Sequence, residues 1–108
     1  MKVNKLIEEL ELTVLTEGDL ERECEGCYCG DLLSWVMSRA KDGDIWLTVM
    51  GNVNAVAVAV LTDCACIILT ENSALDDAAK QRAVQQGVTI LRSGKNAYEL
   101  SVLISKLI

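Results

Sequence analysis

The sequence contains no histidine, no phenylalanine and no proline. Without histidine, a Ser or Cys nucleophile lacks its usual general base, which argues against the common nucleophilic enzymes. With only two Trp and two Tyr, the core must be aliphatic and a surface that stacks nucleic-acid bases is not expected. Basic residues are also scarce, 10 against 16 acidic ones, and the net charge of -6 does not suit binding to a phosphate backbone. We therefore expect no nucleic-acid partner.

A stretch both uncharged and apolar enough to cross a membrane is also lacking. Residues 45–62 carry no formal charge and approach the length of a minimal membrane span. However, Gly51, Asn52 and Asn54 lie in the middle of this stretch, where polar groups are costly in hydrocarbon. The stretch therefore fits two buried elements joined by a turn. The amino-terminal residues show neither a long apolar run nor a small-residue cleavage site, so we expect a cytoplasmic protein without a membrane partner.

The composition suits one compact unit. A chain of 108 residues, 51% of them hydrophobic, has the usual size of a single domain and can build one core. No low-complexity tract and no repeat of solenoid length interrupts it. Five cysteines, an odd number, favour a reducing compartment over a disulfide framework. We expect a single domain over residues 1–108.

The first part of the chain predicts a helix followed by two strands and a second helix. Apolar residues recur at helical spacing over residues 3–10 and then alternate until residues 16–18. Residues 22–28 alternate charged and small side chains, as in a strand with one solvated face. Asp31, after the turn at Gly30, stands where its carboxylate could accept hydrogen bonds from the first amides of the second helix.

The rest of the chain predicts strands that alternate with helices. Continuous apolar runs at residues 44–49, 64–70 and 88–91 indicate interior strands. The Ala- and Val-rich run at residues 55–61 fits a buried strand or a buried helix, and we favour the helix because the turn before it ends in asparagine, a capping residue. Capping signatures predict two more helices; they are Ser73 with Asp76, and Asn96 with Glu99. This order predicts an α/β fold, a single-layer, mostly parallel sheet of about four to six strands with helices packed on its faces.

Five short segments form a series that extends over nearly the whole chain. They are Leu20-Glu21-Arg22, Glu25-Gly26-Cys27-Tyr28, Gly30-Asp31-Leu32-Leu33-Ser34, Asp44-Ile45-Trp46-Leu47-Thr48-Val49 and Asn54-Ala55-Val56-Ala57-Val58-Ala59. In this series the chain resembles a DRTGG domain. Such domains are found alone, as inserts in CBS-containing pyrophosphatases and fused to bacterial phosphotransacetylases, and they are similar to the amino-terminal domain of HPr kinase. The resemblance implies a regulatory module, with a partner enzyme, rather than a catalyst.

The chain departs from the family pattern at four positions. In the motif that names the family, Glu21 stands at the Asp position, Glu25 at the Thr position and Cys27 at the second Gly. In addition, Asn52 stands where many relatives have a histidine.

The sequence also lacks the kinase part of HPr kinase. A phosphate-binding P-loop needs two glycines separated by four residues and followed by Lys and Ser or Thr. Here Gly94-Lys95 is followed by Asn96, and the nearest earlier glycine is Gly87. We expect no enzyme; a hydrolase built from carboxylates alone stays open, although nothing in the sequence points to it.

Three predicted strand-to-helix turns could bind a ligand, because ligands of parallel sheets gather at the carboxyl ends of the strands. At these turns Arg92 and Lys95 could face a phosphate, with neutral hydrogen bonds from Asn52, Asn54 and Ser34. The full candidate site is Gly30, Asp31, Ser34, Gly51, Asn52, Asn54, Arg92 and Lys95. We expect an adenine nucleotide or another anionic small molecule as ligand, and no cofactor. The alternative is that the asparagines and Asp31 only cap helices.

The cysteines support a second hypothesis, a metal- or iron–sulfur-binding accessory protein. Its ligands would be Cys24, Cys27, Cys29, Cys64 and Cys66, because thiolates are the only soft ligands in a chain without histidine. Against it, the pairs 27/29 and 64/66 have the spacing of neighbours on one face of a strand, where cysteine behaves as a small buried hydrophobe. We favour the core role and no metal.

Self-association is a third expectation and is compatible with ligand binding. One small sheet cannot easily cover the hydrophobic surface of Tyr28, Trp35 and residues 103–108, which favours a homodimer. Together with the resemblance to DRTGG domains, which implies the regulatory role, these features lead us to expect a cytoplasmic, non-catalytic regulatory domain that binds an anionic ligand.

Overall fold

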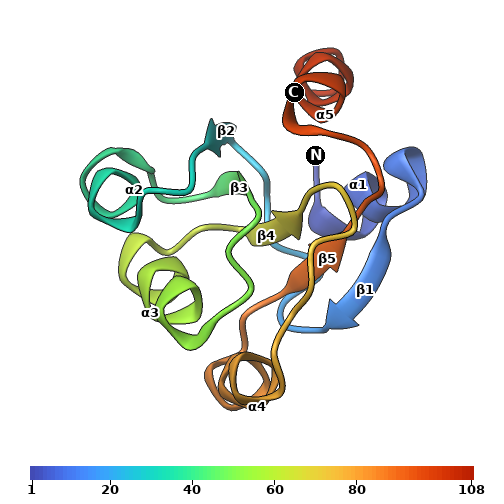
Figure 1. The fold of residues 1–108 in the computed structure, drawn as a ribbon. Coiled ribbons are helices and arrows are strands. Elements are labelled where there is room, and N and C mark those ends of the chain that lie inside the picture. Colours follow the sequence, from blue (N-terminus) through green and yellow to red (C-terminus); the bar gives the residue numbers. More distant parts are fainter.

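The computed structural model describes residues 1–108 and consists of one five-stranded sheet and five helices. Along the chain the elements are α1 (Val3–Leu10), β1 (Thr13–Thr16), β2 (Gly26–Cys29), α2 (Leu33–Arg39), β3 (Asp44–Thr48), α3 (Val53–Thr62), β4 (Cys66–Leu69), α4 (Asp77–Gln86), β5 (Ile90–Arg92) and α5 (Ala97–Ser105). The strands lie in the order β1-β5-β4-β3-β2. β2 to β5 are parallel, and β1 pairs antiparallel with β5. The predicted α/β fold with a mostly parallel sheet is confirmed (Figure 1).

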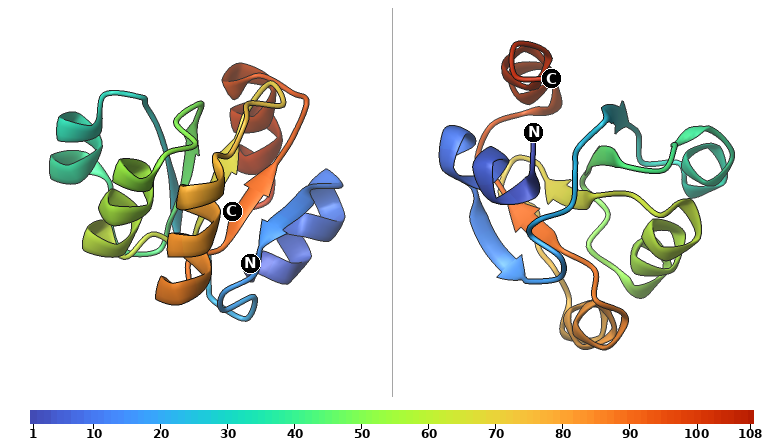
Figure 2. Two further views of the ribbon diagram at one scale, coloured as in Figure 1. Left: turned by 60° about the horizontal axis from the view of Figure 1, so that its bottom comes forward. Right: turned by 180° about the vertical axis from the view of Figure 1, so that it is seen from behind.

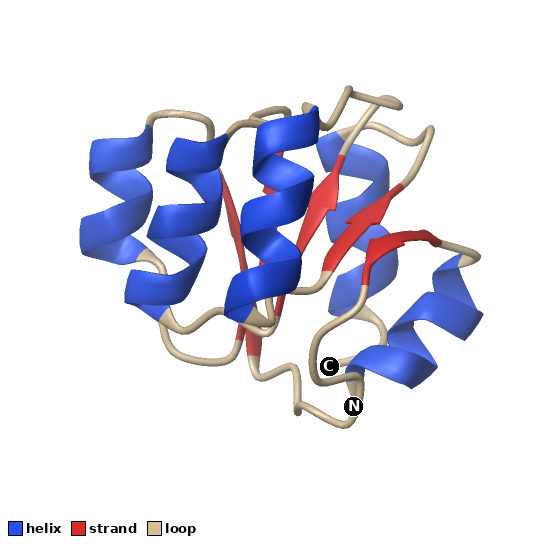
Figure 3. Ribbon diagram, turned by 90° about the horizontal axis from the view of Figure 1, so that it is seen from below, coloured by secondary structure: helices blue, strands red, loops and turns tan.

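Helices cover both faces of the sheet. α2, α3 and α4 lie on one face, and α1 and α5 lie on the other (Figures 1 and 3). Each face has its own core: the α1–α5 side buries Ile45 and Leu47, and the opposite side buries Trp46. Successive residues of β3 point to opposite faces, so this central strand contributes to both cores. The two chain ends lie close together on the α1–α5 side (Figure 2).

The ambiguous run at residues 55–61 is helical, as predicted, and forms most of α3. Ala55 and Ala59 are almost fully buried in the core around Trp46. Alanine at these positions lets the helix axis lie close to the sheet, which a bulkier residue would prevent. None of the helices combines the length and hydrophobicity needed to cross a bilayer.

The prediction that Asp31 caps α2 is wrong. Leu32 occupies the position before the helix and contributes no side-chain hydrogen bond. The Asp31 carboxylate instead accepts hydrogen bonds from the Thr48 hydroxyl at 2.8 Å and from the Val49 amide at 2.9 Å. Asp31 therefore ties the turn after β2 to the end of β3, its neighbour in the sheet.

Three other helices begin with a side-chain cap. Asn52, rather than Asn54, caps α3, and its side chain accepts a hydrogen bond from the Ala55 amide. Asp76, rather than Ser73, caps α4. The predicted capping box of Asn96 and Glu99 at α5 is confirmed.

The antiparallel pairing brings the first strand beside the last one. Thr16, 3% exposed, donates its hydroxyl to the Val88 carbonyl at 2.7 Å and accepts the Ile90 amide at 3.0 Å. In this orientation Thr13, at the start of β1, pairs with Arg92, at the end of β5. The start of β1 therefore reaches the same edge of the sheet as the ends of the four parallel strands.

Candidate ligand-binding site

The loops that follow β4 and β5 are joined at the carboxyl edge of the sheet. The amide of Glu71 donates to the Lys95 carbonyl at 3.0 Å, and the amide of Asn72 donates to the Ser93 carbonyl at 2.9 Å. Glu71 and Asn72 both have φ of 56°, in the left-handed region. This conformation is unfavourable for Glu and tolerated by Asn, so the two hydrogen bonds to the neighbouring loop help to hold a strained turn.

A hollow of about 400 Å³ opens between these loops and the start of β1, and we call it the cationic hollow. It is lined by Leu10, Glu11, Thr13, Asn72, Arg92, Ser93, Gly94, Lys95 and Glu99. Only Leu10 among them is hydrophobic, so a ligand here would be held by polar and charged groups.

The two cations of this hollow are free to bind an anion. The side chains of Arg92 and Lys95 take part in none of the hydrogen bonds or ion pairs of the structure, whereas Lys2, Lys5 and Arg22 are all paired with carboxylates. A guanidinium and an ammonium beside each other can both donate to one phosphate.

Two carboxylates share the cationic hollow with these cations. Glu99 uses one oxygen in the capping box, where it accepts the Asn96 amide at 3.1 Å. Glu11, in the left-handed position after α1, makes no ion pair. The hollow therefore offers both anion-binding donors and carboxylate acceptors.

A second hollow, of about 260 Å³, lies at the same edge, beyond the joined loops, and we call it the thiol hollow. It is lined by Cys29, Gly30, Asp31, Leu47, Thr48, Val49, Thr70, Glu71 and Ala97. Asp31 has its hydrogen bonds to Thr48 and Val49 here, so this carboxylate stabilises the edge rather than standing free.

The structure brings only part of the sequence-derived site together. Arg92 and Lys95 line the cationic hollow, and Gly30 and Asp31 line the thiol hollow. The other four candidates, Ser34, Gly51, Asn52 and Asn54, line neither hollow.

Asn52 and Gly51 have structural roles at this edge. The Asn52 side chain is used as the cap of α3. Gly51 lies against the loop before α4, because a Cβ built on it would stand 1.9 Å from the Ala74 carbonyl oxygen. Asn54 and Ser34 are exposed on the first turns of α3 and α2.

Sequence reasoning missed the partners that complete the cationic hollow. Asn72 comes from the loop after β4, and Glu11 and Thr13 come from the other end of the chain. The left-handed turn at residues 71–72 contains no glycine, the residue that usually marks such a turn in a sequence. The direction of β1 in the sheet cannot be read from the sequence either.

The five cysteines differ in their exposure to solvent. Cys24 and Cys66 are buried, Cys64 is half-buried, and Cys27 and Cys29 are exposed. Nowhere in the chain do three Cys, Asp or Glu side chains come together in an arrangement that could hold a metal ion. The geometry thus gives the alternative of a metal- or cluster-binding protein no ligand set.

A family model, described as the DRTGG domain, matches residues 5–107. The chain belongs to the DRTGG domain family. No curated protein matches the chain closely in sequence. Among solved structures it is similar to the CBS and DRTGG domains of the regulatory region of Clostridium perfringens pyrophosphatase, solved in complex with the activator diadenosine tetraphosphate. The TM-score is 0.78 at 12% sequence identity, over 95% of this chain and 45% of that chain. The similarity shows the shared fold, and this chain spans under half the length of that structure.

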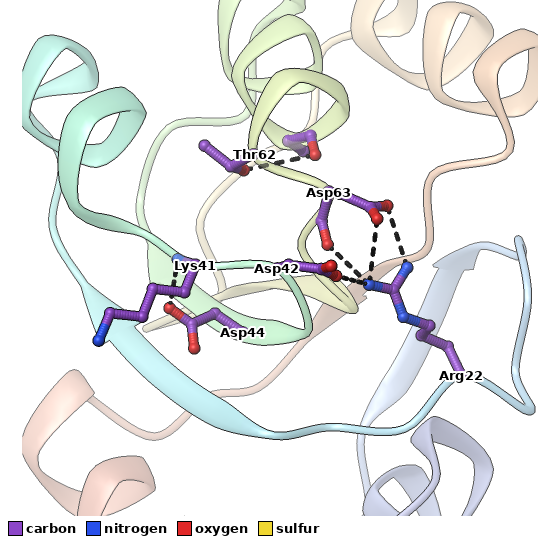
Figure 4. A network of polar contacts seen from close by, with 7 residues as sticks. Arg22, Lys41, Asp42, Asp44, Thr62 and Asp63 are labelled. Atoms are coloured by element: carbon purple, nitrogen blue, oxygen red, sulfur yellow. Dashed lines mark hydrogen bonds and ion pairs between the residues drawn. The ribbon is translucent and has the colours of Figure 1, made fainter.

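In this DRTGG domain, Arg22 from the family's motif region lies at the opposite, amino-terminal edge of the sheet. Figure 4 shows its guanidinium between Asp42 and Asp63. It donates to the Asp42 carboxylate, to the Asp63 carboxylate at 3.0 Å and to the Asp63 carbonyl at 3.0 Å. Asp63 is the left-handed residue that ends α3, and Asp42 belongs to the loop before β3. Arg22 therefore clamps two loops and is not free for a ligand.

The clamp affects the titration of Asp63. Its hydrogen bond with Arg22 is the main reason that the pKa of the Asp63 carboxyl lies below the ordinary value of 3.8. The same bond raises the pKa of the Arg22 guanidinium. Both shifts arise because the hydrogen-bonded pair favours the charged form of each group.

Proposed function

We propose that this DRTGG domain is a non-catalytic regulatory module of the cytoplasm that senses an anionic small molecule, a nucleotide being the best match, and reports it to a partner enzyme. The observation that supports this most is the pair of unpartnered cations, Arg92 and Lys95, in a polar hollow at the carboxyl edge of a parallel sheet. Ligands of such sheets bind at this edge.

The charge pattern of the cationic hollow favours a nucleotide over a bare anion. Arg92 and Lys95 suit a phosphate, while Glu11 and Glu99 are acceptors for hydroxyl donors. A nucleotide presents both groups, because its ribose hydroxyls lie next to its phosphates. The similar pyrophosphatase regulatory region was solved with an adenine dinucleotide activator, which supports this ligand class.

Isothermal titration calorimetry at low salt, with ATP and diadenosine tetraphosphate, tests the proposal. We expect saturable binding that Arg92→Gln and Lys95→Gln each weaken by at least about tenfold, since a hydrogen bond to a charged group contributes about 1.5–3 kcal/mol. Lys80→Gln is the matched control, because Lys80 is an exposed, unpaired cation on α4, away from the hollow. No heat at millimolar ligand would refute nucleotide binding, and equal weakening by the control would refute the site.

We also propose that the domain self-associates. Tyr28 and Leu103 are packed against the two cores, so less of the predicted surface is free than expected. Exposed hydrophobic side chains nevertheless remain, with Trp35 54% and Tyr98 77% exposed. Light scattering coupled to size-exclusion chromatography measures the mass: a dimer supports self-association, and a monomer at all concentrations contradicts it.

A further inference from the structure

Two thiols stand side by side on the exposed edge strand of the sheet. Cys27 and Cys29 lie on β2, the last strand in the order β1-β5-β4-β3-β2, and both are exposed. They pair in register with Ile45 and Leu47, so both thiols are on the α1–α5 face. The Sγ of Cys29 lies 3.3 Å from the Oγ of Ser101 on α5. Solvent reaches this pair because the helix only partly covers the edge strand.

The surroundings favour ionisation of one of the two thiols. Cys27, the neighbouring thiol on the same face of β2, is the largest cause that lowers the pKa of the Cys29 thiol to about 6, because its S–H can donate to a Cys29 thiolate; Ser101 contributes less. Ser101 has one hydroxyl proton, which it donates to the Ala97 carbonyl at 2.6 Å or can turn toward a thiolate. Partial burial and the nearby Asp31 carboxylate act in the opposite direction. The pKa of the Cys27 thiol is raised chiefly because its proton is held by the Cys29 thiolate, and further by partial burial and by the negative charge of Cys29 beside it.

We propose that Cys29 and Cys27 form a thiol–disulfide exchange site for small disulfides such as oxidised glutathione. The Cys29 thiolate attacks one sulfur of the disulfide, so that a mixed disulfide forms at Cys29 and one glutathione thiolate leaves. Cys27 then gives its proton to the released glutathione thiolate and attacks the Cys29 sulfur, which releases the second glutathione as a thiolate that takes a proton from water. In total, two protein thiols are oxidised to one disulfide while one glutathione disulfide is reduced to two thiols.

The spacing of Cys27 and Cys29 makes the disulfide between them easy to reduce. Residues two apart in a strand are separated by about 6.6 Å between Cα atoms, near the upper limit of about 6.8 Å for a disulfide. Closing the Cys27–Cys29 bond therefore strains the edge strand, and a strained, exposed disulfide is easily reduced again. This behaviour suits a switch better than a structural bridge.

The other three cysteines are internal controls. Cys24 and Cys66 are 3% and 1% exposed, so a dissolved disulfide cannot reach them without unfolding. Burial raises the pKa of the Cys64 thiol to about 12, which leaves almost no thiolate at neutral pH. Exchange should therefore be confined to β2.

Reaction of Cys29 and Cys27 would alter the surface at the carboxyl edge of the sheet. Cys29 lines the thiol hollow, so a glutathione adduct would occupy that space, and the disulfide would remove the contact between Cys29 and Ser101. α5 also carries Glu99 of the cationic hollow, and its first residue, Ala97, lines the thiol hollow. The exchange itself does not depend on ligand binding and can be tested without any ligand.

The experiment treats the reduced full chain with oxidised glutathione at pH 6, followed by acid quenching and intact-mass measurement. An ordinary thiol of pKa about 8.5 is about 0.3% ionised at this pH, whereas Cys29 should be about half ionised. A thiolate of lower pKa is also a weaker nucleophile, which offsets part of this advantage. Cys29 should therefore react about tenfold faster than an ordinary thiol. We expect the wild type to pass through a single glutathione adduct, which then releases glutathione as the disulfide closes and leaves a protein two hydrogens lighter than the reduced chain. Cys27→Ser should stop at the adduct, Cys29→Ser should lose the fast reaction, and Cys64→Ser should behave as wild type.

Peptide mapping of the quenched wild type locates the adduct independently of any variant that fails to fold. An adduct on Cys27, Cys24, Cys64 or Cys66, or a reaction no slower in Cys29→Ser than in wild type, would overturn the assignment of Cys29 as the attacking thiol. A wild-type adduct as persistent as that of Cys27→Ser would overturn the second step.

Discussion

Replacing Arg22 by alanine should destabilise the domain without changing the carboxyl edge. The guanidinium binds the carboxylates of Asp42 and Asp63 and the Asp63 carbonyl, and so joins the loop before β3 to the end of α3 (Figure 4). The side chains of Asp42 and Asp63 are 76% and 66% exposed, so each ion pair should contribute only about 0.2–1 kcal/mol. The hydrogen bond to the Asp63 carbonyl should add about 1 kcal/mol. Together the loss is about 2 kcal/mol.

A loss of this size is easily measured. For a domain of this length, about 2 kcal/mol lowers Tm by roughly 8–16 °C. Thermal unfolding followed by circular dichroism should show this drop for Arg22→Ala and a smaller drop for Arg22→Lys, which keeps the charge but cannot reach both loops at once. Arg82→Ala is the control, because Arg82 is exposed on α4 and makes no ion pair.

The pH dependence gives a second check on the clamp. Arg22 lowers the pKa of Asp63 below 3.8 in the folded state, so the stabilisation is present above that pH and disappears as the pH falls through the lowered pKa. In Arg22→Ala this part of the acid sensitivity should vanish. A Tm for Arg22→Ala within 1–2 °C of the Arg82→Ala value, about the effect of a neutral surface change, would refute the role assigned to Arg22.

Two further substitutions test the architecture of the carboxyl edge. Asp31→Ala removes the acceptor of the Thr48 hydroxyl and the Val49 amide, so it should lower the free energy of unfolding, measured in urea, by about 2–3 kcal/mol. Asp31→Asn keeps one acceptor oxygen and should lower it by less than about 1 kcal/mol. Equal losses for the two variants would contradict these hydrogen bonds. Gly51→Ala places a Cβ against the Ala74 carbonyl and should lower the free energy of unfolding by about 2 kcal/mol or more. Gly87 has φ of 69° and open space around it, so Gly87→Ala should lower it by only about 1 kcal/mol. The reverse order would be inconsistent with this packing.

Local sequence signals predicted most of the elements, because the physics that sets them is itself local. The Ala- and Val-rich run at 55–61 is a helix, and the capping box at Asn96 and Glu99 begins α5 as expected. A buried strand and a buried helix can share one composition, and the turn before residue 55 decided between them correctly.

The predictions that failed concern residues whose side chains interact with a distant part of the chain. Asp31 stands in a position suited to a helix cap, yet its carboxylate binds β3, and only the parallel pairing of β2 with β3 makes that possible. Likewise, the sequence marks Arg92 and Lys95 as anion-binding candidates, but Glu11 and Thr13 line the same hollow only because β1 runs antiparallel to β5. Sheet order and strand direction depend on long-range contacts that no local pattern encodes.

An anionic ligand that binds between the loops after β4 and β5 should be detected by a nuclear magnetic resonance titration of the labelled domain with ATP. We expect the largest chemical-shift changes on the amides of residues 71–72 and 92–96, with saturation at a single site. Shifts concentrated around Arg22 and Asp63 at the opposite edge, or none at millimolar ATP, would contradict it.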